Sequence, residues 1–564
     1  MNIIKLPRYL LHSKFNFKNS FILAKAHDEI VKSGLFNADF YLEHYHEAKK
    51  SLMDPLDYYL LHGYKKGHIP SLDFDPDFYL NVYPDVKYSG INPLVHYVLY
   101  GKNEGKLIQK SSAVLRRKEI IDTNFNLLNN HEFIEKPLIS IIILNRDGLH
   151  HLKRLFVDFD NKTNYKNYEI IVVDNASSDG SVEFLKELST DLPIRIIENS
   201  VNISFSKGNN DAAKIANGDY LLLLNNDIEP TFGWLNEMMG TMLNNRDVGA
   251  VGAKLIFPYY FSRKMKHKSF TIQHCGDIFS ERIYPCCLYA KNKSHKHGIF
   301  DSSVNEDKEC ISVTGAVMLI KKDIYDKCGG LDEEYNYGLE DVDFTLRLYK
   351  NNYKTLYCGT ALLFHHESST RLKDKNYFDN DKHNFKIFWN KWGDYLSKNM
   401  LIDKIHENKF FTEKKLKITF VDTNFKNHND SYKMIKGLSK EFYKSNYDID
   451  LISDADDYFC GSSCDVLISF DLDYELENLE ARDDIIKIFS LNNFNFSQED
   501  DFSKLNHYNI IITSKSYIYT YLKENISINK PIFNISNDSN KDHAENILFN
   551  IEAILKNNEW FSPN

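Results

Sequence analysis

A run of leucines that stops at two amides and a carboxylate constrains this chain more than any other feature. The run 221–224 is long enough for one buried strand, and Asn225, Asn226 and Asp227 follow it directly. In open α/β sheets, ligands bind beyond the carboxyl ends of the strands. A carboxylate oxygen there suits a divalent cation that carries a diphosphate. The alternative is a plain Asn/Asp turn after a strand. Other segments of the chain are needed to distinguish a binding site from such a turn.

The residues around this run alternate between apolar stretches and helical patterns, which predicts a mostly parallel α/β sheet. The other strand candidates are 137–144, 169–173 and 194–198. Because parallel strands point the same way, the polar residues that follow them are expected at one edge of the sheet. These residues are Asn145, Arg146, Asp174, Asn175, Asn225, Asn226 and Asp227.

A loop rich in amides, 202–210, precedes the leucine run and leads into a helix. It contains Lys207, Gly208 and Asn209. A Gly and a Lys near a helix start suit a nucleotide or its phosphates, although one such loop is weak evidence on its own.

Two later segments carry further candidates. Helical spacing puts Glu340, Asp341 and Asp343 in the first turn of a helix, where the helix N-terminus favours ionised carboxylates. Complementation of the helix dipole is the competing explanation. Another apolar strand ends in His365 and His366, which are candidate metal ligands beside an Asp-ended strand. Residues 312–320 read as a further strand with a close-packed Gly.

Taken in order, these segments resemble the inverting family 2 glycosyltransferases of the GT-A fold, notably their rhamnosyltransferase-like bacterial branch. The resemblance covers about residues 137–371. The matching segments are VVDNASSDGS, NISFSKGNN, LLLLNNDIEP, IQHCGD, VTGAVMLI, GGLDEEY, GLEDVDFTLRL and HHESSTR.

The resemblance implies a role for each site residue on the donor side. Asp174 holds the base or ribose of the nucleotide, with Asn145 and Arg146 nearby. Asp227 binds Mg²⁺ or Mn²⁺ on the donor diphosphate. Asn225 stands where the family usually has the first Asp of Asp-x-Asp, so one negative charge is lost and a lower metal affinity is expected.

The remaining roles concern the second metal ligand, the base and the leaving group. His365 is the expected second metal ligand, and His366 is its rival. Asp341 is the expected general base that deprotonates the acceptor hydroxyl, so one base suffices and the anomeric centre inverts. Lys207 or Arg371 is expected to stabilise the negative charge of the leaving diphosphate.

An internal repeat occupies the N-terminal part of the chain. Residues 36–67 recur as residues 74–105 at a constant offset of 38 positions, with Phe, Tyr, Pro and Gly in register. We expect a helical domain over 1–115, a linker over 116–136, a GT-A domain with a mixed sheet flanked by helices over 137–400, and a Rossmann-like α/β accessory domain over 415–564. The repeats predict a helical packing module, and the alternative is an aromatic surface that holds a glycan acceptor or a partner protein.

Bulk properties narrow the class of protein. A chain of 564 residues is too long for one core, and its net charge of −10 argues against a nucleic-acid binder. The sequence has no apolar run of about 18 residues and no signal-peptide pattern, and its eight cysteines suggest a reducing cytoplasm. Basic residues near the start of the chain are compatible with a peripheral association with the inner face of the membrane. An oligomer is a further alternative.

These observations predict a cytoplasmic bacterial enzyme that moves a sugar from a nucleotide-sugar, UDP- or dTDP-linked, to a glycan or lipid-linked glycan of capsule or O-antigen. A sugar-nucleotide pyrophosphorylase is one rival, but residues 145–148 are too short for its Gly-rich nucleotide loop. The other rival is a catalytically decayed glycan-binding or scaffold protein. Asn225, which stands in place of the first Asp of Asp-x-Asp, is compatible with such a loss of activity.

Overall fold

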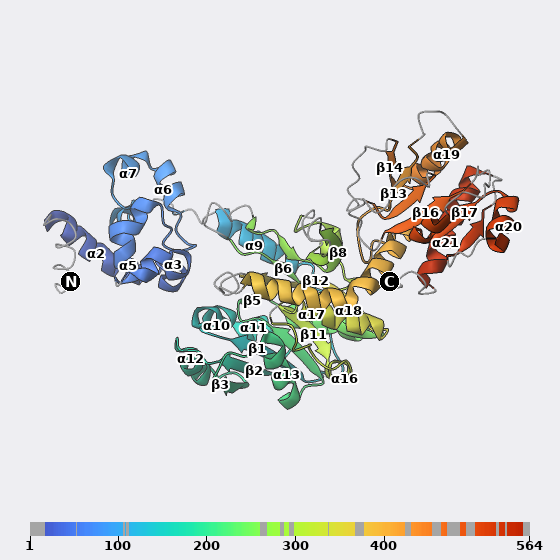
Figure 1. Ribbon diagram of the computed structural model, residues 1–564. Coiled ribbons are helices and arrows are strands. Elements are labelled where there is room, and N and C mark those ends of the chain that lie inside the picture. The colour runs from blue at the N-terminus through green and yellow to red at the C-terminus, as the bar shows by residue number, and fades with distance from the viewer. Residues whose placement is uncertain are drawn as a thin grey trace.

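The computed structural model contains a helical N-terminal part, a central α/β part and a C-terminal α/β part (Figure 1). It describes residues 17–556 except for 52, 105–107, 109–111, 260–267, 283–286, 293–297, 337, 367–376, 424–429, 454–463, 471–484, 492–501, 526–529 and 536–538. Arg371 and the terminal Gly of the second repeat, Gly105, lie outside these residues.

The two repeats fold into equivalent helical units, so the N-terminal part is helical as expected. In each unit a short helix begins after an Asn or Asp cap, and a second helix widens into a π-helical turn that ends at Gly63 or Gly101. A Cβ atom on Gly63 would lie 1.9 Å from the hydroxyl of Tyr41, and one on Gly101 would lie 2.1 Å from that of Tyr79. Glycine is therefore required where each buried tyrosine crosses the second helix.

The helices of this part are short. They are α2 (Phe17–Ser33), α3 (Ala38–His44), α4 (His46–Lys50), α5 (Pro55–Tyr58), η2 (Tyr59–Gly63) and η3 (Tyr64–Lys66), then α6 (Pro76–Val82), α7 (Pro84–Ser89), α8 (Pro93–His96) and η4 (Tyr97–Gly101). Their aromatic side chains form one core, in which Tyr41, Tyr59, Phe74 and Tyr79 are fully buried. These repeat tyrosines therefore pack against each other, and packing accounts for them without a ligand.

A ten-stranded mixed sheet forms the central part, which confirms the predicted mixed sheet flanked by helices. Its strand order is β10-β12-β6-β11-β4-β1-β2-β3, with β5 on β12 and β7 on β6. The strands are β1 (Ile139–Asn145), β2 (Tyr168–Asn175), β3 (Ile194–Asn199), β4 (Tyr220–Leu224), β5 (Ile228–Pro230), β6 (Val248–Ile256), β7 (Ile272–His274), β10 (Lys308–Cys310), β11 (Val317–Lys321) and β12 (Lys354–His365).

Parallel pairing of β4, β1, β2 and β3 brings their carboxyl ends to one edge. Residues of β4 pair with β1 on one side and with antiparallel β11 on the other, so the leucine run is buried on every side. The all-apolar sequence of 221–224 follows from that position, because a strand buried on both faces has no polar face.

Helices cover both faces of this sheet. They are α10 (Leu149–Leu155), α11 (Phe159–Lys162), α12 (Ser181–Leu188), α13 (Phe205–Ile215), α14 (Trp234–Asn244), α15 (Ser302–Asn305), α16 (Lys322–Lys327) and α17 (Glu340–Lys350). A separate hairpin pairs β8 (Asp277–Arg282) with β9 (Cys287–Asn292). The long helix α18 (Tyr377–His406) runs from this part toward the C-terminal part (Figure 1).

Two segments differ from the sequence expectation or add to it. The strand expected over 312–320 begins only at Val317. Its first residues form a loop instead, because Gly315 donates a hydrogen bond to Asp341 and Thr314 lies against His274. In the stretch expected to be a linker, residues up to Phe125 belong to helix α9 (Ser112–Phe125), whose Ile120 is buried in the core of the sheet.

The C-terminal part is an additional α/β unit around a six-stranded parallel sheet of order β14-β13-β15-β16-β17-β18. Its elements are β13 (Lys417–Val421), α19 (Asp430–Lys444), β14 (Asp448–Ile452), β15 (Val466–Ser469), β16 (Ile486–Ser490), η11 (Phe502–His507), β17 (Ile510–Thr513), α20 (Ser516–Asn525), β18 (Ile532–Asn534) and α21 (Asn540–Lys556).

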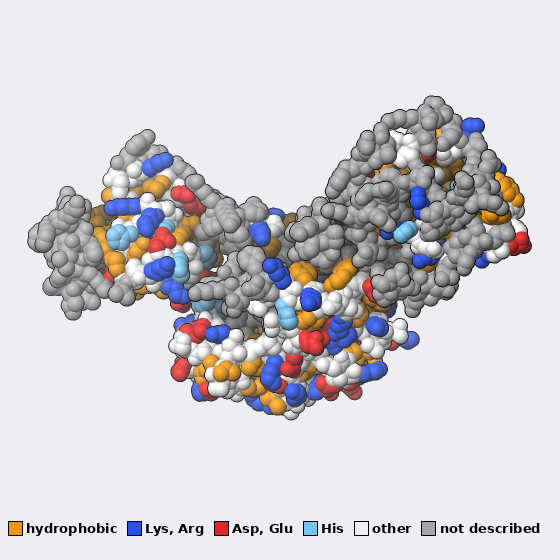
Figure 2. All heavy atoms as spheres, viewed as in Figure 1, with side chains coloured by type: hydrophobic (Ala, Val, Ile, Leu, Met, Phe, Trp, Pro, Cys, Tyr) orange, Lys and Arg blue, Asp and Glu red, His pale blue; other side chains and the backbone are white. Residues whose placement is uncertain are grey.

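Among the described residues, no helix is both long and apolar enough to cross a membrane. In the view of Figure 2, acidic and basic side chains are interspersed over the central part, and neither sign forms a continuous face there.

Candidate functional site

The carboxyl ends of β1, β2 and β4 are joined by a chain of side-chain hydrogen bonds. Asn226 donates to Asn145 at 2.8 Å, and Asn145 donates to Asp174 at 3.0 Å. Asp174 also accepts from the backbone N–H of Ser177 at 2.9 Å and from its hydroxyl at 2.6 Å. A Cβ atom on Gly148 would lie 2.4 Å from Oδ1 of Asn145, so this glycine leaves room for the chain of amides. The three strand ends expected to meet do meet.

The other residues predicted for the donor side have other partners in the part of the chain that the structure describes. Asn175 donates to the backbone carbonyl of Ile203 at 3.2 Å, and Arg146 is exposed. Lys207 lies on the first turn of α13, where its ammonium group is 3.0 Å from Asp211. Asn209 is buried and donates within its own helix to the carbonyl of Phe205 at 2.9 Å.

Asp227 lies beside His365, with 3.2 Å between Oδ1 and Nε2. Burial alone would raise the pKa of Asp227, but the charge of the nearby His365 outweighs it and holds that pKa well below its usual value. Oδ1 of Asp227 accepts no well-formed hydrogen bond from the described residues. A buried carboxylate oxygen next to an imidazole nitrogen is a donor set that suits Mg²⁺ or Mn²⁺.

His366 has a different neighbour, because successive residues of a strand face opposite sides. Its Nε2 lies 3.3 Å from Oε2 of Glu229, and its backbone N–H donates to the carbonyl of Asp227 at 3.0 Å. Burial would raise the pKa of Glu229, yet the hydrogen bond from His366 and the charge of Arg117 hold it well below its usual value. Of the two predicted histidines, His365 is therefore the one beside Asp227.

Asp341 lies in the first turn of α17, as expected, beside the loop that precedes β11. Its Oδ2 accepts a hydrogen bond from the N–H of Gly315 at 2.8 Å. Glu340 is buried and accepts from the N–H of Gly338 at 2.6 Å, which fixes the turn before the helix. Leu339 adopts φ of 72°, a strained conformation for a branched side chain, at the helix start.

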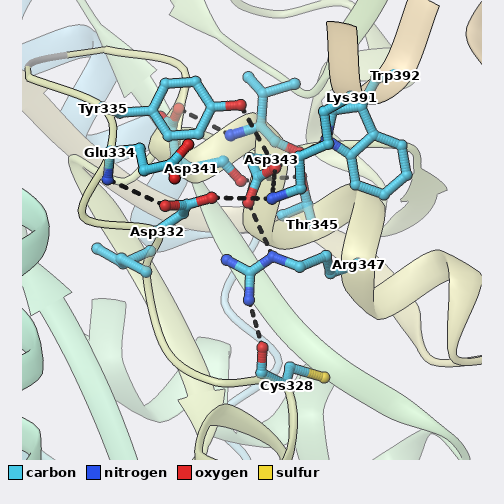
Figure 3. A network of polar contacts seen from close by, with 12 residues as sticks. Cys328, Asp332, Glu334, Tyr335, Asp341, Asp343, Thr345, Arg347, Lys391 and Trp392 are labelled. Atoms are coloured by element: carbon cyan, nitrogen blue, oxygen red, sulfur yellow. Dashed lines mark hydrogen bonds and ion pairs between the residues drawn. The ribbon is translucent and has the colours of Figure 1, made fainter. Parts of the chain in front are cut away.

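Asp343 is fully buried and gathers donors from three elements (Figure 3). Arg347 donates to it at 2.8 Å, Trp392 of α18 donates at 2.8 Å, and Lys391 lies 2.7 Å away. Tyr335 is 3.4 Å away. These contacts join α17 to α18 at a position two residues beyond Asp341.

Two residues of the segment IQHCGD, His274 and Asp277, were not expected to have a role from the sequence. His274 is buried, and its Nε2 lies 3.4 Å from the N–H of Thr314 and 3.3 Å from that of Gly276. Because Nε2 is the acceptor, Nδ1 carries the proton and faces Asp277 at 3.6 Å. Burial and the charge of His365 lower the pKa of His274 to about 3.

Asp277 and Asp341 both contact the loop 312–315. The N–H of Asp277 donates to the carbonyl of Ser312 at 3.0 Å, and Asp341 accepts from the N–H of Gly315 at 2.8 Å. Burial and then the charge of Asp341 raise the pKa of Asp277 to about 8. The only sequence signal was an Asp and a His beside one Gly, between apolar residues.

Comparisons with known proteins agree with this architecture. Residues 139–327 match the family model described as glycosyl transferase family 2, so this stretch is a domain of that family. An uncharacterized protein, y4gI, of Sinorhizobium fredii is 31% identical over 240 residues, which is 42% of this chain and 25% of that protein. The O-antigen biosynthesis protein RfbC of Myxococcus xanthus is 28% identical over 239 residues, 42% of this chain and 18% of that protein.

The chain thus spans a quarter or less of the length of these two relatives. Among solved structures, a mannosyltransferase from Pyrobaculum calidifontis in complex with GDP-Man and Mn²⁺ is 15% identical, with a TM-score of 0.30, over 46% of this chain and 67% of that one. GalNAc-T7 with UDP, GalNAc and Mn²⁺ is 13% identical, with a TM-score of 0.33, over 54% of this chain and 59% of that one.

Proposed function

We propose that the central part of this chain is an inverting glycosyltransferase that moves a sugar from a nucleotide-diphosphate sugar to a hydroxyl of a glycan. The observation that carries the proposal is the pairing of Asp227 with His365 at 3.2 Å, at the sheet edge where Asn145 and Asp174 also lie. We place the reaction in the synthesis of a surface polysaccharide such as capsule or O-antigen, because one relative is named for O-antigen biosynthesis. The rhamnosyltransferase-like branch stays a prediction.

On the donor side, the buried amide and carboxylate groups hold the nucleoside. Asp174 is fixed by Asn145 and Ser177, so its carboxylate is preorganised to accept hydrogen bonds from a ribose or base. Lys207 can turn toward a phosphate only by giving up its exposed ion pair with Asp211, which costs little. UDP- and dTDP-sugars are the donors we expect.

The residues present fit a divalent cation. Asp227 and His365 would hold Mg²⁺ or Mn²⁺, and Asn225 stands close in sequence with a carbonyl oxygen in place of a second carboxylate. When bound there, the ion supplies electrostatic stabilisation of the negative charge on the leaving diphosphate.

On the acceptor side, Asp341 is the proposed general base. The N–H of Gly315 and the start of α17 both favour its ionised form, which keeps it ready to take the proton of the acceptor hydroxyl. The hydroxyl then attacks the anomeric carbon opposite the leaving diphosphate, so one base suffices and the configuration inverts. A donor made in the cytoplasm places the enzyme there, and the acceptor is a glycan or a lipid-linked glycan.

The test is a calorimetric screen of UDP-, dTDP-, GDP- and CMP-sugars with Mn²⁺ and with EDTA. The wild type is expected to bind one class of donor in a metal-dependent way, and Asp227→Ala is expected to lose that binding. Asp219→Ala is the matched control, because Asp219 is an exposed acid at the opposite end of the same strand.

Folded protein that binds none of these donors would contradict the proposal and favour a decayed domain that serves as a glycan-binding scaffold. Binding that survives both EDTA and Asp227→Ala would contradict the metal site and keep the donor class.

A further inference from the structure

A cavity of about 330 Å³ lies between the first N-terminal repeat and the central part. Phe40, Glu43 and His44 of α3 line one side, and Arg154 of α10 lies on the other, with Tyr259 and His366. Its volume is at the lower end of the range of about 300–1,000 Å³ for ligand pockets. Neither part would form this cavity alone.

The first repeat is joined to the central part by an ion pair between Glu43 and Arg154. Burial would raise the pKa of Glu43, but the charges of Arg154 and His44 outweigh it and lower that pKa. The second repeat has Asn81 and Val82 at the positions of Glu43 and His44, 38 residues later. The copy that lines the cavity therefore differs from its duplicate in the residues that face the central part.

The charged side chains of the cavity wall balance in sign: Arg117, Lys153 and Arg154 are basic, and Asp39, Glu43 and Glu229 are acidic. Arg117 lies 2.6 Å from Glu229, His366 lies 3.3 Å from the same carboxylate, and Arg154 pairs with Glu43. The wall therefore presents hydrogen-bond donors and acceptors with little net charge. A free anion gains little in such surroundings, whereas a neutral polyol can bond to both signs.

Aromatic rings form the rest of the wall. Phe40 is half-buried and lies 4.3 Å, centroid to centroid, from His44, while Tyr259 and Phe270 lie 5.9 Å apart across from it. Aromatic rings bury a large area at a small cost in side-chain entropy. Their flat faces match the C–H faces of a sugar ring, and paired polar groups match its hydroxyls.

The cavity adjoins the proposed reaction site. His366 lines it and donates its backbone N–H to the carbonyl of Asp227 at 3.0 Å, while the preceding residue, His365, faces the Asp227 carboxylate. We infer that this cavity binds a neutral saccharide unit of the acceptor glycan, so that the first N-terminal repeat forms part of the acceptor site. The inference rests on the proposed function and adds that the acceptor unit bound in this cavity is a neutral saccharide.

The test uses saturation-transfer NMR on the full chain with methyl glycosides as probes. The neutral probes are the glucoside, galactoside, mannoside, rhamnoside and N-acetylglucosaminide, and methyl glucuronoside is the acidic probe. At least one neutral glycoside is expected to bind the wild type. Phe40→Ala and Tyr259→Ala are each expected to weaken that binding at least about tenfold, which is the size of loss typical of a central contact residue.

Phe78→Ala is the matched control, because Phe78 occupies the position of Phe40 in the second repeat, is half-buried and does not line the cavity. It is expected to bind like the wild type. Thermal melting of each variant separates loss of binding from loss of fold, and Tyr259→Ala lies outside the repeats, so it tests the cavity without altering their core.

Three results would overturn the inference: no neutral glycoside binds, only the glucuronoside binds, or Phe40→Ala and Tyr259→Ala bind as well as Phe78→Ala. Nucleotide-sugar binding by the same wild-type protein separates the two proposals. If the donor binds and the glycosides behave in one of these ways, only the acceptor cavity is wrong, whereas the absence of donor binding contradicts the proposed function itself.

Discussion

The carboxylate of Asp343 accepts a 2.8 Å hydrogen bond from the indole nitrogen of Trp392, which lies 49 residues further along the chain. Asp343 is on α17, two residues after the proposed base Asp341, and Trp392 is on α18 (Figure 3). The sequence could not decide between a helix-dipole role and a site role for Asp343. The structure gives it a third role, as the buried acceptor that joins two helices.

Asp343→Asn is expected to lower the free energy of unfolding by about 2–4 kcal/mol, because it leaves the charge of Arg347 without a buried partner. Chemical denaturation followed by tryptophan fluorescence measures this. Asp332→Asn is the control, since Asp332 contacts the same Lys391 but is partly exposed, and it is expected to cost less than about 1 kcal/mol. Equal losses for the two variants would contradict the buried-acceptor role.

Asp341→Asn is expected to lower kcat for sugar transfer by about 10²–10⁴-fold, because an amide cannot take the proton of the acceptor hydroxyl. Donor affinity, measured by calorimetry, is expected to stay unchanged. Asp323→Asn is the matched control, because Asp323 is an exposed acid in the first turn of α16. Transfer by Asp341→Asn at the wild-type rate would assign the base elsewhere.

His365→Ala and His366→Ala are expected to behave differently. His365 lies 3.2 Å from Asp227, so its loss is expected to weaken Mn²⁺-dependent donor binding about tenfold or more, the usual effect of removing one metal ligand or its support. His366 pairs with Glu229, so its loss is expected to leave the Mn²⁺ dependence in place. Mn²⁺ titration of donor binding measures both, and the reverse order would make His366 the ligand.

Asp277→Asn is expected to change how stability depends on pH. The pKa of Asp277 is raised by burial and by Asp341 to about 8, so its favourable contribution is complete below about pH 4 and is lost as the pH rises through about 8. Relative to the variant, the wild type is therefore expected to lose about 1–3 kcal/mol between pH 5 and pH 9. Thermal melting across this range measures it.

Asp219→Asn, which removes an exposed carboxyl, is the control for that pH series. If the stability of the wild type and that of Asp277→Asn change in parallel with pH, Asp277 ionises freely in the fold. That result would contradict the influence of burial and of Asp341 on its pKa.

Local pattern was enough to bring the residues of the proposed donor site to one edge of the sheet. The leucine run had to be a buried strand, and the apolar stretches before it had to be its parallel neighbours, so Asn145, Asp174 and Asp227 had to share an edge. The same reasoning placed Asp341 in a first helical turn. It was wrong about residues 312–316, where a contact with Asp341 and His274 replaces the start of a strand.

The sequence by itself determined the strand ends, the repeat and the identity of the polar residues at each strand tip, because strand and helix periodicity and turn chemistry are local properties. Only the tertiary structure decided that His365 rather than His366 faces Asp227, that the charge of Asp341 acts on Asp277, and that Glu43 meets Arg154. The His365–Asp227 and Glu43–Arg154 contacts join residues 138 and 111 positions apart, in elements whose mutual packing no local pattern encodes. Burial and the charges brought together there shift the pKa values of Asp227, Asp277 and Glu43.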